Sequence, residues 1–327
     1  MKVPMNLKTI RAASLAVLVL VLGNPALAQE WPNRPVRIVV PYTPGTGQDT
    51  IARTLAPRLA EKFGQPFVIE NRPGASGNIG MEAVAKAPPD GYTLLMTAST
   101  VVLNPLLYKD LGWDPYRDLA PVANVTNGFL ALVVNNNVKA SNVREFIELL
   151  KAQPGKLSYS STGVGTPQHL SGELFKSATG TFMLHVPYRG SAGAITGVIG
   201  GEVEAMFMPV HSALPQAQQR RLKILGVIND RRVAVAPDVP TIQEAGGPKL
   251  DASVWYPLYA PAKTPLDVIN RLSAAISDIL RQKEVAESLD KQGLTVAYLD
   301  PAGLASLMRK ESARWGAVVK EKNLKGE

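Results

Sequence analysis

Apolar and polar residues follow one another along the chain in patterns that alternate between strand and helix. In the first third, short runs of β-branched and apolar residues predict strands at 36–40, 67–69 and 93–96. Between the first two runs, apolar residues at helical spacing predict a helix from Asp49 to Phe63, with a kink or a break at Pro57. A second helix is predicted after the Gly-rich segment 71–77. This order with short connections favours a parallel sheet covered on both faces.

A second series of the same kind begins near residue 129. Its predicted strands lie at 129–134, 158–160, 183–186 and 205–208. Its predicted helices lie at 143–150, 167–178 and 192–199. The C-terminal region is predicted to be mainly helical, because apolar residues from Val268 to Ile279 recur at helical spacing. The chain therefore reads as an α/β protein of two domains, with no internal repeat of fixed period.

The first 28 residues are predicted to be a secretory signal peptide. A basic start is followed by an apolar run at 12–22 and by Ala-Leu-Ala at 26–28, which fits a cleavage site. The run is shorter than the roughly 20 apolar residues that span a bilayer. Cleavage after Ala28 would leave a periplasmic protein and would lower the net charge from +8 to +5, because only basic residues are lost.

Composition removes several classes of chemistry. The chain has no Cys, which excludes thiolate catalysis, iron–sulfur clusters and zinc fingers. Its three histidines, His169, His185 and His211, are not at metal-ligand spacing. The basic residues are scattered without interleaved aromatics, which together with the export signal argues against nucleic acid. We therefore expect no metal, no cofactor and no nucleic-acid partner.

The sequence also lacks the usual catalytic motifs. It contains no phosphate-binding G-x-x-x-x-G-K-[ST], no G-x-S-x-G nucleophile elbow and no H-E-x-x-H. An exported hydrolase that uses Ser160, His169 and Asp49 is the alternative hypothesis. It is the less favoured one, because lone hydroxyls and a histidine on a helix more often cap and pack.

Polar loops that precede three predicted helices point to binding instead. The first loop ends at Asp49, the second comprises residues 161–166 and the third comprises residues 188–191. A helix N-terminus has unpaired N–H groups and about half a positive charge, and so binds carboxylates without any cation. In open parallel sheets such loops gather where ligands bind. In any single loop the Ser, Thr or Asp could simply cap its helix, but three such loops favour a binding protein.

Seven motifs in order along the chain resemble those of Bug-type periplasmic solute-binding proteins, the substrate-binding components of tripartite tricarboxylate transporters. The motifs lie at 31–49, 71–80, 89–93, 159–170, 185–190, 200–203 and 237–241. The resemblance implies a type II-like periplasmic-binding-protein fold with two lobes, each a mostly parallel sheet flanked by helices. Lobe 1 would comprise 29–125 plus 253–327, and lobe 2 would comprise 126–252. The resemblance also implies a monomer that closes over its ligand.

The implied ligand is a small carboxylate, namely a di- or tricarboxylate, an amino acid or an aromatic acid. Lobe 1 would contribute ligand-binding residues Tyr42, Thr43, Gly47, Asp49, Thr97 and Ser99. Lobe 2 would contribute Ser161, Thr162, Gly165, Thr166, His169, Tyr188, Arg189 and Pro209. The receptor would deliver its ligand to the membrane components of the transporter or present its closed form to a sensor kinase. No reaction is expected.

Some of these residues have a second interpretation. Asp49 would repel a carboxylate, so we expect it mainly to cap its helix and orient the loop. Arg189 either pairs with a second carboxylate or is solvated, and His169 is expected to be structural. The segment 71–80 is expected to be a fixed turn and helix start rather than a contact loop. Thr46 stands where relatives usually have glycine, which bears on the identity of the ligand.

Overall fold

The computed structural model of the chain describes residues 30–250 and 252–321. The predicted signal peptide and its cleavage site lie outside the described residues. The chain divides into two units at Asn33, and every element below belongs to the unit that begins at Arg34. Within the described ranges, no helix combines the length and the apolar character needed to cross a bilayer.

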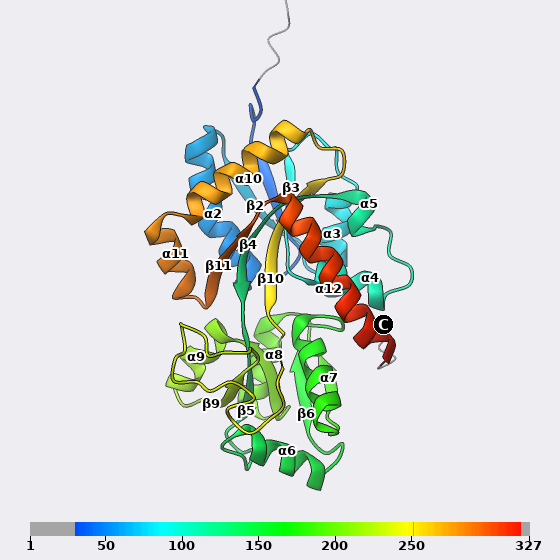
Figure 1. Cartoon of the computed structure of the whole chain (residues 1–327), viewed down its shortest axis with the longest axis vertical. Coiled ribbons are helices and arrows are strands. Elements are labelled where there is room, and N and C mark those ends of the chain that lie inside the picture. Colours follow the sequence, from blue (N-terminus) through cyan, green and yellow to red (C-terminus); the bar gives the residue numbers. More distant parts are fainter. Residues whose placement is uncertain (1–29, 251, 322–327) are drawn as a thin grey trace, which may run out of the picture. The chain divides into compact units, whose positions relative to one another are not determined.

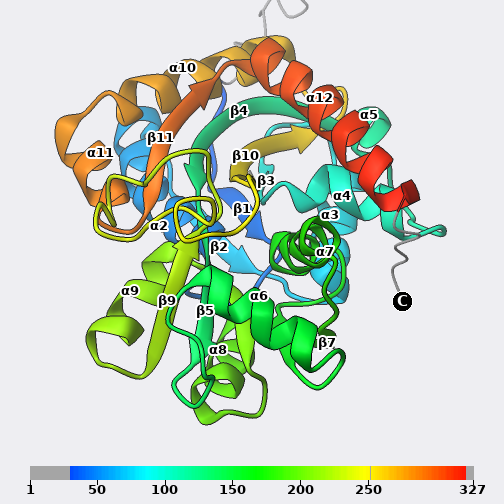
Figure 2. The same cartoon turned by 60° about the horizontal axis from the view of Figure 1, so that its bottom comes forward.

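One sheet has six strands in the order β11-β4-β10-β3-β1-β2. Its strands are β1 (Val36–Val40), β2 (Phe67–Asn71), β3 (Thr93–Met96), β4 (Leu119–Gly128), β10 (Val254–Pro261) and β11 (Leu294–Leu299). The accompanying helices are α2 (Gly47–Phe63), α3 (Asn78–Ala85), α4 (Thr100–Leu107), α5 (Pro115–Asp118), α10 (Leu266–Leu280), α11 (Lys283–Asp290) and α12 (Pro301–Glu321). Helices α2 and α10 lie side by side, and α12 lies against α4 and β4 (Figure 1 and Figure 2).

The other sheet has five strands in the order β7-β6-β8-β5-β9. Its strands are β5 (Leu130–Asn135), β6 (Ser158–Ser161), β7 (Leu184–Pro187), β8 (Ala205–Pro209) and β9 (Leu222–Val227). Its helices are α6 (Val143–Ala152), α7 (Pro167–Thr179), α8 (Ser191–Gly200) and α9 (Val210–Gln218). The inner strands β5 and β8 are almost entirely buried, as expected for strands covered on both faces.

The predicted α/β class is confirmed, but the prediction of mostly parallel sheets is wrong, because both sheets are mixed. Strand β1 is parallel to β2 and β3, whereas β10 is antiparallel to β3 and β4. Likewise β6 is parallel to β7 and β8, whereas β5 is antiparallel to β8 and β9. The chain passes from β4 almost directly into β5 and returns to the first sheet at β10. β5 and β10 are each reached from the preceding strand without an intervening helix, so nothing forces them to be parallel to their neighbours.

The helix α2 continues through Pro57, so the chain is not broken there. Its apolar side chains, including Ile51, Leu55 and Leu59, are buried on both sides of the proline and hold the two halves against the sheet. The C-terminal region is mainly helical as predicted. The predicted division into lobes at 125/126 and 252/253 stays a prediction, and β4 spans the first of these boundaries.

Candidate ligand-binding site

A polar cavity of about 50 Å³ lies where loops that follow strands of both sheets meet. Four helices begin at its wall, namely α2, α7, α8 and α9. Hydroxyl and amide side chains dominate the lining, with one imidazole; they belong to Tyr42, Thr43, Thr46, Gln48, Thr162, Thr166, Gln168, Ser191, His211, Ser212 and Tyr256. None of the described residues that line the cavity is an Asp, Glu, Lys or Arg. The cavity therefore offers hydrogen bonds and helix N-termini in place of charged side chains.

The structure brings part of the predicted site together at this cavity. The predicted residues that line it are Tyr42, Thr43, Gly47, Thr162, Thr166 and Pro209. The predicted residues that do not line it are Asp49, Thr97, Ser99, Ser161, Gly165, His169, Tyr188 and Arg189. Four residues of the second group support the loops that carry the first, namely Asp49, Ser161, Gly165 and His169. Direct contact of any of them with a ligand stays a prediction.

The loop before α2 has a defined internal construction. Gly45 has a φ of +81°, which glycine adopts without strain, and Thr46 then forms the N-cap of α2. The hydroxyl of Thr46 donates to the carbonyl of Thr43 (3.1 Å), and the amide of Gly45 donates to Oδ2 of Asp49 (2.9 Å). The Asp49 side chain thus folds back over its own loop. Asp49 thus orients the loop as expected, but the expectation that it caps the helix is wrong, because Thr46 is the N-cap residue of α2 and no side chain caps this helix.

Two further side chains, those of Arg53 and Asn71, hold the carboxylate of Asp49 in place. Its carboxylate, only 4% exposed, accepts hydrogen bonds from Nε of Arg53 (3.0 Å) and from Nδ2 of Asn71 (2.9 Å). Burial raises the pKa of Asp49, but the hydrogen bonds from Arg53, Gly45 and Asn71 outweigh it and hold the pKa below its usual value. Asp49 is therefore ionised and paired at neutral pH, and its oxygens are already engaged.

The loop before α7 repeats the construction of the loop before α2. Gly165 has a φ of +79°, and the hydroxyl of the N-cap Thr166 donates to the carbonyl of Gly163 (2.8 Å). The amide of Gly165 donates to Nδ1 of His169 (3.1 Å), as the amide of Gly45 donates to Asp49. We call residues 45–49 and 165–169 the two G-T-x-Q turns, because their sequences are Gly-Thr-Gly-Gln-Asp and Gly-Thr-Pro-Gln-His. Aligning the two loops in the sequence could have revealed this repeat.

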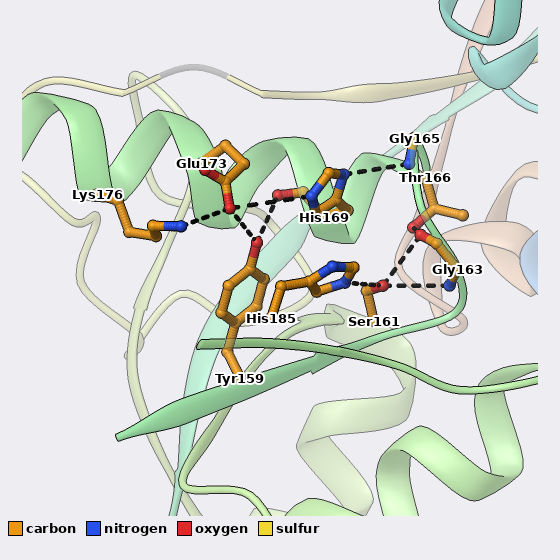
Figure 3. Close-up of polar contacts among 9 residues, drawn as sticks. All are labelled: Tyr159, Ser161, Gly163, Gly165, Thr166, His169, Glu173, Lys176 and His185. Atoms are coloured by element: carbon orange, nitrogen blue, oxygen red, sulfur yellow. Dashed lines mark hydrogen bonds and ion pairs between the residues drawn. The ribbon is translucent and has the colours of Figure 1, made fainter. Parts of the chain in front are cut away.

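His169 belongs to a buried polar cluster below the second turn (Figure 3). Its ring stacks on that of His185 with centroids 4.1 Å apart, and Glu173 accepts hydrogen bonds from Tyr159 (2.7 Å) and Lys176 (2.7 Å) nearby. Burial lowers the pKa of His169 to about 4 and that of His185 to about 3. Both rings are therefore neutral at pH 7. This leaves Nδ1 of His169 free to accept from Gly165, which gives His169 the structural role expected of it.

One Ser–His pair within hydrogen-bond distance bears on the hydrolase alternative. Oγ of Ser161 and Nε2 of His185 lie 2.7 Å apart (Figure 3). However, Ser161 has no exposed surface, and its hydroxyl also contacts the amide and the carbonyl of Gly163. No carboxylate within the described ranges orients His185. The pair therefore holds the loop in place and has no access to a substrate.

The three residues proposed for that hydrolase are not assembled either. The hydroxyl of Ser160 is fully buried and donates to the carbonyl of Ala194 (3.1 Å). His169 accepts from Gly165, and Asp49 is engaged by Arg53 and Asn71. Each of the three groups has a separate structural partner.

The remaining predicted residues lie behind the lining or on the surface. Thr97 and Ser99 are buried after β3, and Oγ1 of Thr97 has no hydrogen-bond partner in the described chain. Tyr188 donates to Oε2 of Glu202 (3.0 Å). Arg189 is exposed and does not line the cavity, although its neighbour Gly190 does, and this exposure favours the solvated interpretation.

The segment 71–80 is more than the fixed turn that was expected. It begins α3 and does not line the cavity, as predicted. However, Oγ of Ser76 donates to the carbonyl of Val164 (2.7 Å) in the loop after β6, and the hydroxyl of Tyr108 donates to the same carbonyl (3.2 Å). Ser76 and its neighbour Ala75 both have positive φ, +54° and +45°. The segment therefore also contacts the loop after β6, and the expectation that it is not a ligand-contact loop stays a prediction.

The described residues form a two-sheet α/β unit with a polar cavity at the N-termini of four helices, which is the arrangement of a solute-binding receptor. Comparison with known sequences agrees. The sequence model of the tripartite tricarboxylate transporter family receptor matches residues 51–324, and the chain belongs to this family. One relative is the protein BugT of Bordetella pertussis, 34% identical over 93% of this chain and 94% of the relative.

Solved structures share the fold over almost their whole length. A protein described as a periplasmic transporter is 40% identical, with a TM-score of 0.84 over 90% of this chain and 99% of that one. Rpa4515 of R. palustris with adipate is 32% identical, with a TM-score of 0.88 over 91% and 100%. MatC of Rhodopseudomonas palustris with bound malate is 31% identical, with a TM-score of 0.80 over 88% and 100%. The family and these neighbours imply a periplasmic location.

Proposed function

We propose that this protein captures a small carboxylate in the polar cavity and delivers it to the membrane components of a tripartite tricarboxylate transporter. The observation that carries the proposal is the convergence of four helix N-termini on a cavity whose described lining has no charged side chain. Each N-terminus contributes about half a positive charge. Together they favour an anion and disfavour a cation.

The backbone N–H groups at the starts of these helices are the donors that would bind the carboxylate. None of the N-cap residues Thr46, Thr166, Gly190 and Pro209 makes a side-chain cap. Cavity-lining residues whose first-turn amides have no acceptor in the described chain are Gly47, Gln48, Gln168, Ser191, His211 and Ser212. By contrast, the side chain of Asn142 caps α6, away from the cavity. A carboxylate would satisfy the free amides directly.

The relatives support the carboxylate class. Two similar receptors are described with adipate and with malate, both of which are dicarboxylates. Export after cleavage at Ala28, action as a monomer, and closure of two lobes over the ligand complete the proposal. Presentation of the closed form to a sensor kinase is the alternative to delivery. Uptake measurements in cells with and without the transporter's membrane components would separate the two.

Calorimetric and thermal-shift titration of the mature protein tests ligand capture. The panel comprises mono-, di- and tricarboxylates, amino acids and aromatic acids, with a diamine as a cationic control. A ligand at about 100 times its dissociation constant should stabilise the fold by about 2.7 kcal/mol. Binding confined to carboxylates supports the proposal. Binding of the diamine, or silence across the panel with protein refolded free of ligand, contradicts it.

A matched pair of glycine variants locates the site. A Cβ on Gly47 would lie 2.8 Å from the hydroxyl of Tyr256 at the cavity wall, whereas a Cβ on Gly200 would meet no atom within 4 Å. Gly47→Ala should therefore weaken carboxylate binding, and Gly200→Ala should leave it unchanged. Equal affinities in the two variants would place the site elsewhere.

A further inference from the structure

The imidazole in the cavity lining belongs to His211. This residue is the second of α9, and its partly buried side chain lies at the cavity wall. Among the described residues, its ring nitrogens have no hydrogen-bond partner. By contrast, His169 and His185 do not line the cavity, and their rings contact the amide of Gly165 and the hydroxyl of Ser161. Of the three histidines, His211 is therefore the one whose nitrogens are available to a molecule in the cavity.

The elements packed against the start of α9 place no charged side chain on His211. Strands β5 and β8 carry no ionisable residue. Lys223 of β9 donates instead to the carbonyls of Val138 and Ala140. The backbone of His211 lies against Gly293, on which a Cβ would be 3.2 Å from the amide nitrogen of His211. The surroundings of the imidazole are therefore uncharged on these sides.

The other ionisable groups near His211 leave its protonation unchanged. Tyr42 and Tyr256 share the cavity lining, and burial raises the pKa of both phenols, so both are neutral. Asp290 and Lys291 lie at the end of α11, shortly before Gly293, and neither contributes to the pKa of His211. Burial lowers the pKa of His211 to about 4. Without an anion in the cavity, His211 is therefore neutral at pH 7.

The four helix N-termini at the cavity act in the same direction as burial. Each contributes about half a positive charge, which disfavours an imidazolium beside it. A carboxylate bound at these N-termini would reverse the sign of the field at His211. An opposite charge within about 4–6 Å raises the pKa of an imidazole by about 1 to 3. A proton on His211 and an anion in the cavity should therefore stabilise one another.

We propose that His211 takes up a proton when a carboxylate binds in the cavity, so that capture of the anion is coupled to pH. This inference rests on the proposed function and adds a regulation of the same site. The coupling is reciprocal, because the proton raises the affinity for the carboxylate by the factor by which the carboxylate raises the affinity for the proton. The receptor should therefore bind its anion more tightly as the pH falls from 7.5 to 5.5.

Calorimetry in pairs of buffers with different ionisation enthalpies counts the protons taken up on binding. The probes are citrate, malate, adipate, glutamate and benzoate, titrated into the mature wild type and into His211→Gln at pH 5.5 and pH 7.5 in buffers free of carboxylates. The variant keeps a hydrogen-bonding side chain but cannot be protonated, and the titration of the acid itself contributes equally to both proteins.

The expected result follows from a pKa of His211 that rises from about 4 to about 6 when the anion binds. At pH 5.5 the wild type should take up about 0.7 proton more per bound acid than His211→Gln, and at pH 7.5 the two proteins should differ little. Between pH 7.5 and pH 5.5 the affinity of the wild type, relative to that of the variant, should rise about fourfold.

Two further variants keep the outcome interpretable. His169→Gln removes a histidine that does not line the cavity and should take up as many protons on binding as the wild type. His211→Asn serves if His211→Gln fails to fold. Equal proton uptake at pH 5.5 in the wild type and the His211 variant overturns the inference, while binding itself still supports the proposed function. If none of the five acids binds the wild type, the proposed function fails as well.

Discussion

The two G-T-x-Q turns have the same backbone conformation, but the side chain that accepts from the loop amide is charged in one turn and neutral in the other. In the first, the loop amide is held by an ionised Asp49, which is paired with Arg53. In the second, the equivalent amide is held by a neutral His169, which is stacked on His185. The comparison shows that the third helical residue needs only to be an acceptor that reaches back to the loop. The charge of that acceptor differs between the turns. Asp49 and His169 should therefore respond differently to mutation and to pH.

Removal of the acceptor in the first turn should have the largest effect on stability. Asp49→Ala leaves three donors, on Gly45, Arg53 and Asn71, without their shared acceptor. We expect a loss of about 2 kcal/mol or more in the free energy of unfolding, measured by urea denaturation at pH 7.5. Asp278→Ala, which removes an exposed carboxylate paired with Lys62, should change stability far less. A similar loss in both variants would contradict the bracing role of Asp49.

The second turn should make stability depend on pH. The pKa of His169 is lowered by burial to about 4, so the unfolded chain binds a proton that the folded chain does not between about pH 4 and pH 6.5. Stability should therefore be fully present above pH 6.5 and fall as the pH is lowered. For His169 alone the loss at pH 5 relative to pH 8 is about 2 kcal/mol.

A histidine variant tests this dependence. His169→Gln keeps an acceptor and removes the titration, so its unfolding free energy should fall less between pH 8 and pH 5 than that of the wild type. His185, whose pKa is lowered to about 3, Glu173 and Lys176 face the same cluster and remain in the variant. Parallel pH profiles in the two proteins would refute the assignment.

The contact between Ser76 and Val164 should have the smallest effect. Ser76→Ala removes a hydroxyl that donates to the loop of the second turn (2.7 Å), and Tyr108→Phe removes the second donor to the same carbonyl. One neutral hydrogen bond contributes about 1 kcal/mol. Each variant should weaken carboxylate binding about fivefold in calorimetry if this contact forms as the ligand is enclosed. Unchanged affinity in both variants would show that the contact has no part in binding.

The sequence predicted the loops of the site better than the side chains within them. In the first turn the family resemblance indicates Gly47 and Asp49 but not Gln48 between them. In the second turn it indicates Thr166 and His169 but not Gln168. In both turns the third helical residue folds back over the loop, while the second lines the cavity. A motif shows which loop matters, but the direction of each side chain depends on the cap geometry.

The sequence analysis predicts no strand at β4, β9, β10 or β11. Two of these, β4 and β10, contain Pro121, Pro257 and Pro261, and proline argues against a strand because it donates no ladder hydrogen bond. The pairing of β10 with β4 shifts register between Tyr256 and Pro257, so the irregularity falls where the proline lies. Long-range pairing thus decides these elements, and local pattern cannot predict it. The helices and buried strands with strong periodicity were predicted because their signal is local.

The central claim is that helix N-termini and uncharged side chains bind an anion in this cavity. The most direct measurement is calorimetric titration of the wild-type mature protein with the dicarboxylate that binds most tightly, and with its neutral diamide of the same shape. The account predicts saturable binding of the dicarboxylate and none of the diamide at the same concentrations. Equal affinity for the two compounds would contradict it, because the cavity would then recognise shape without charge.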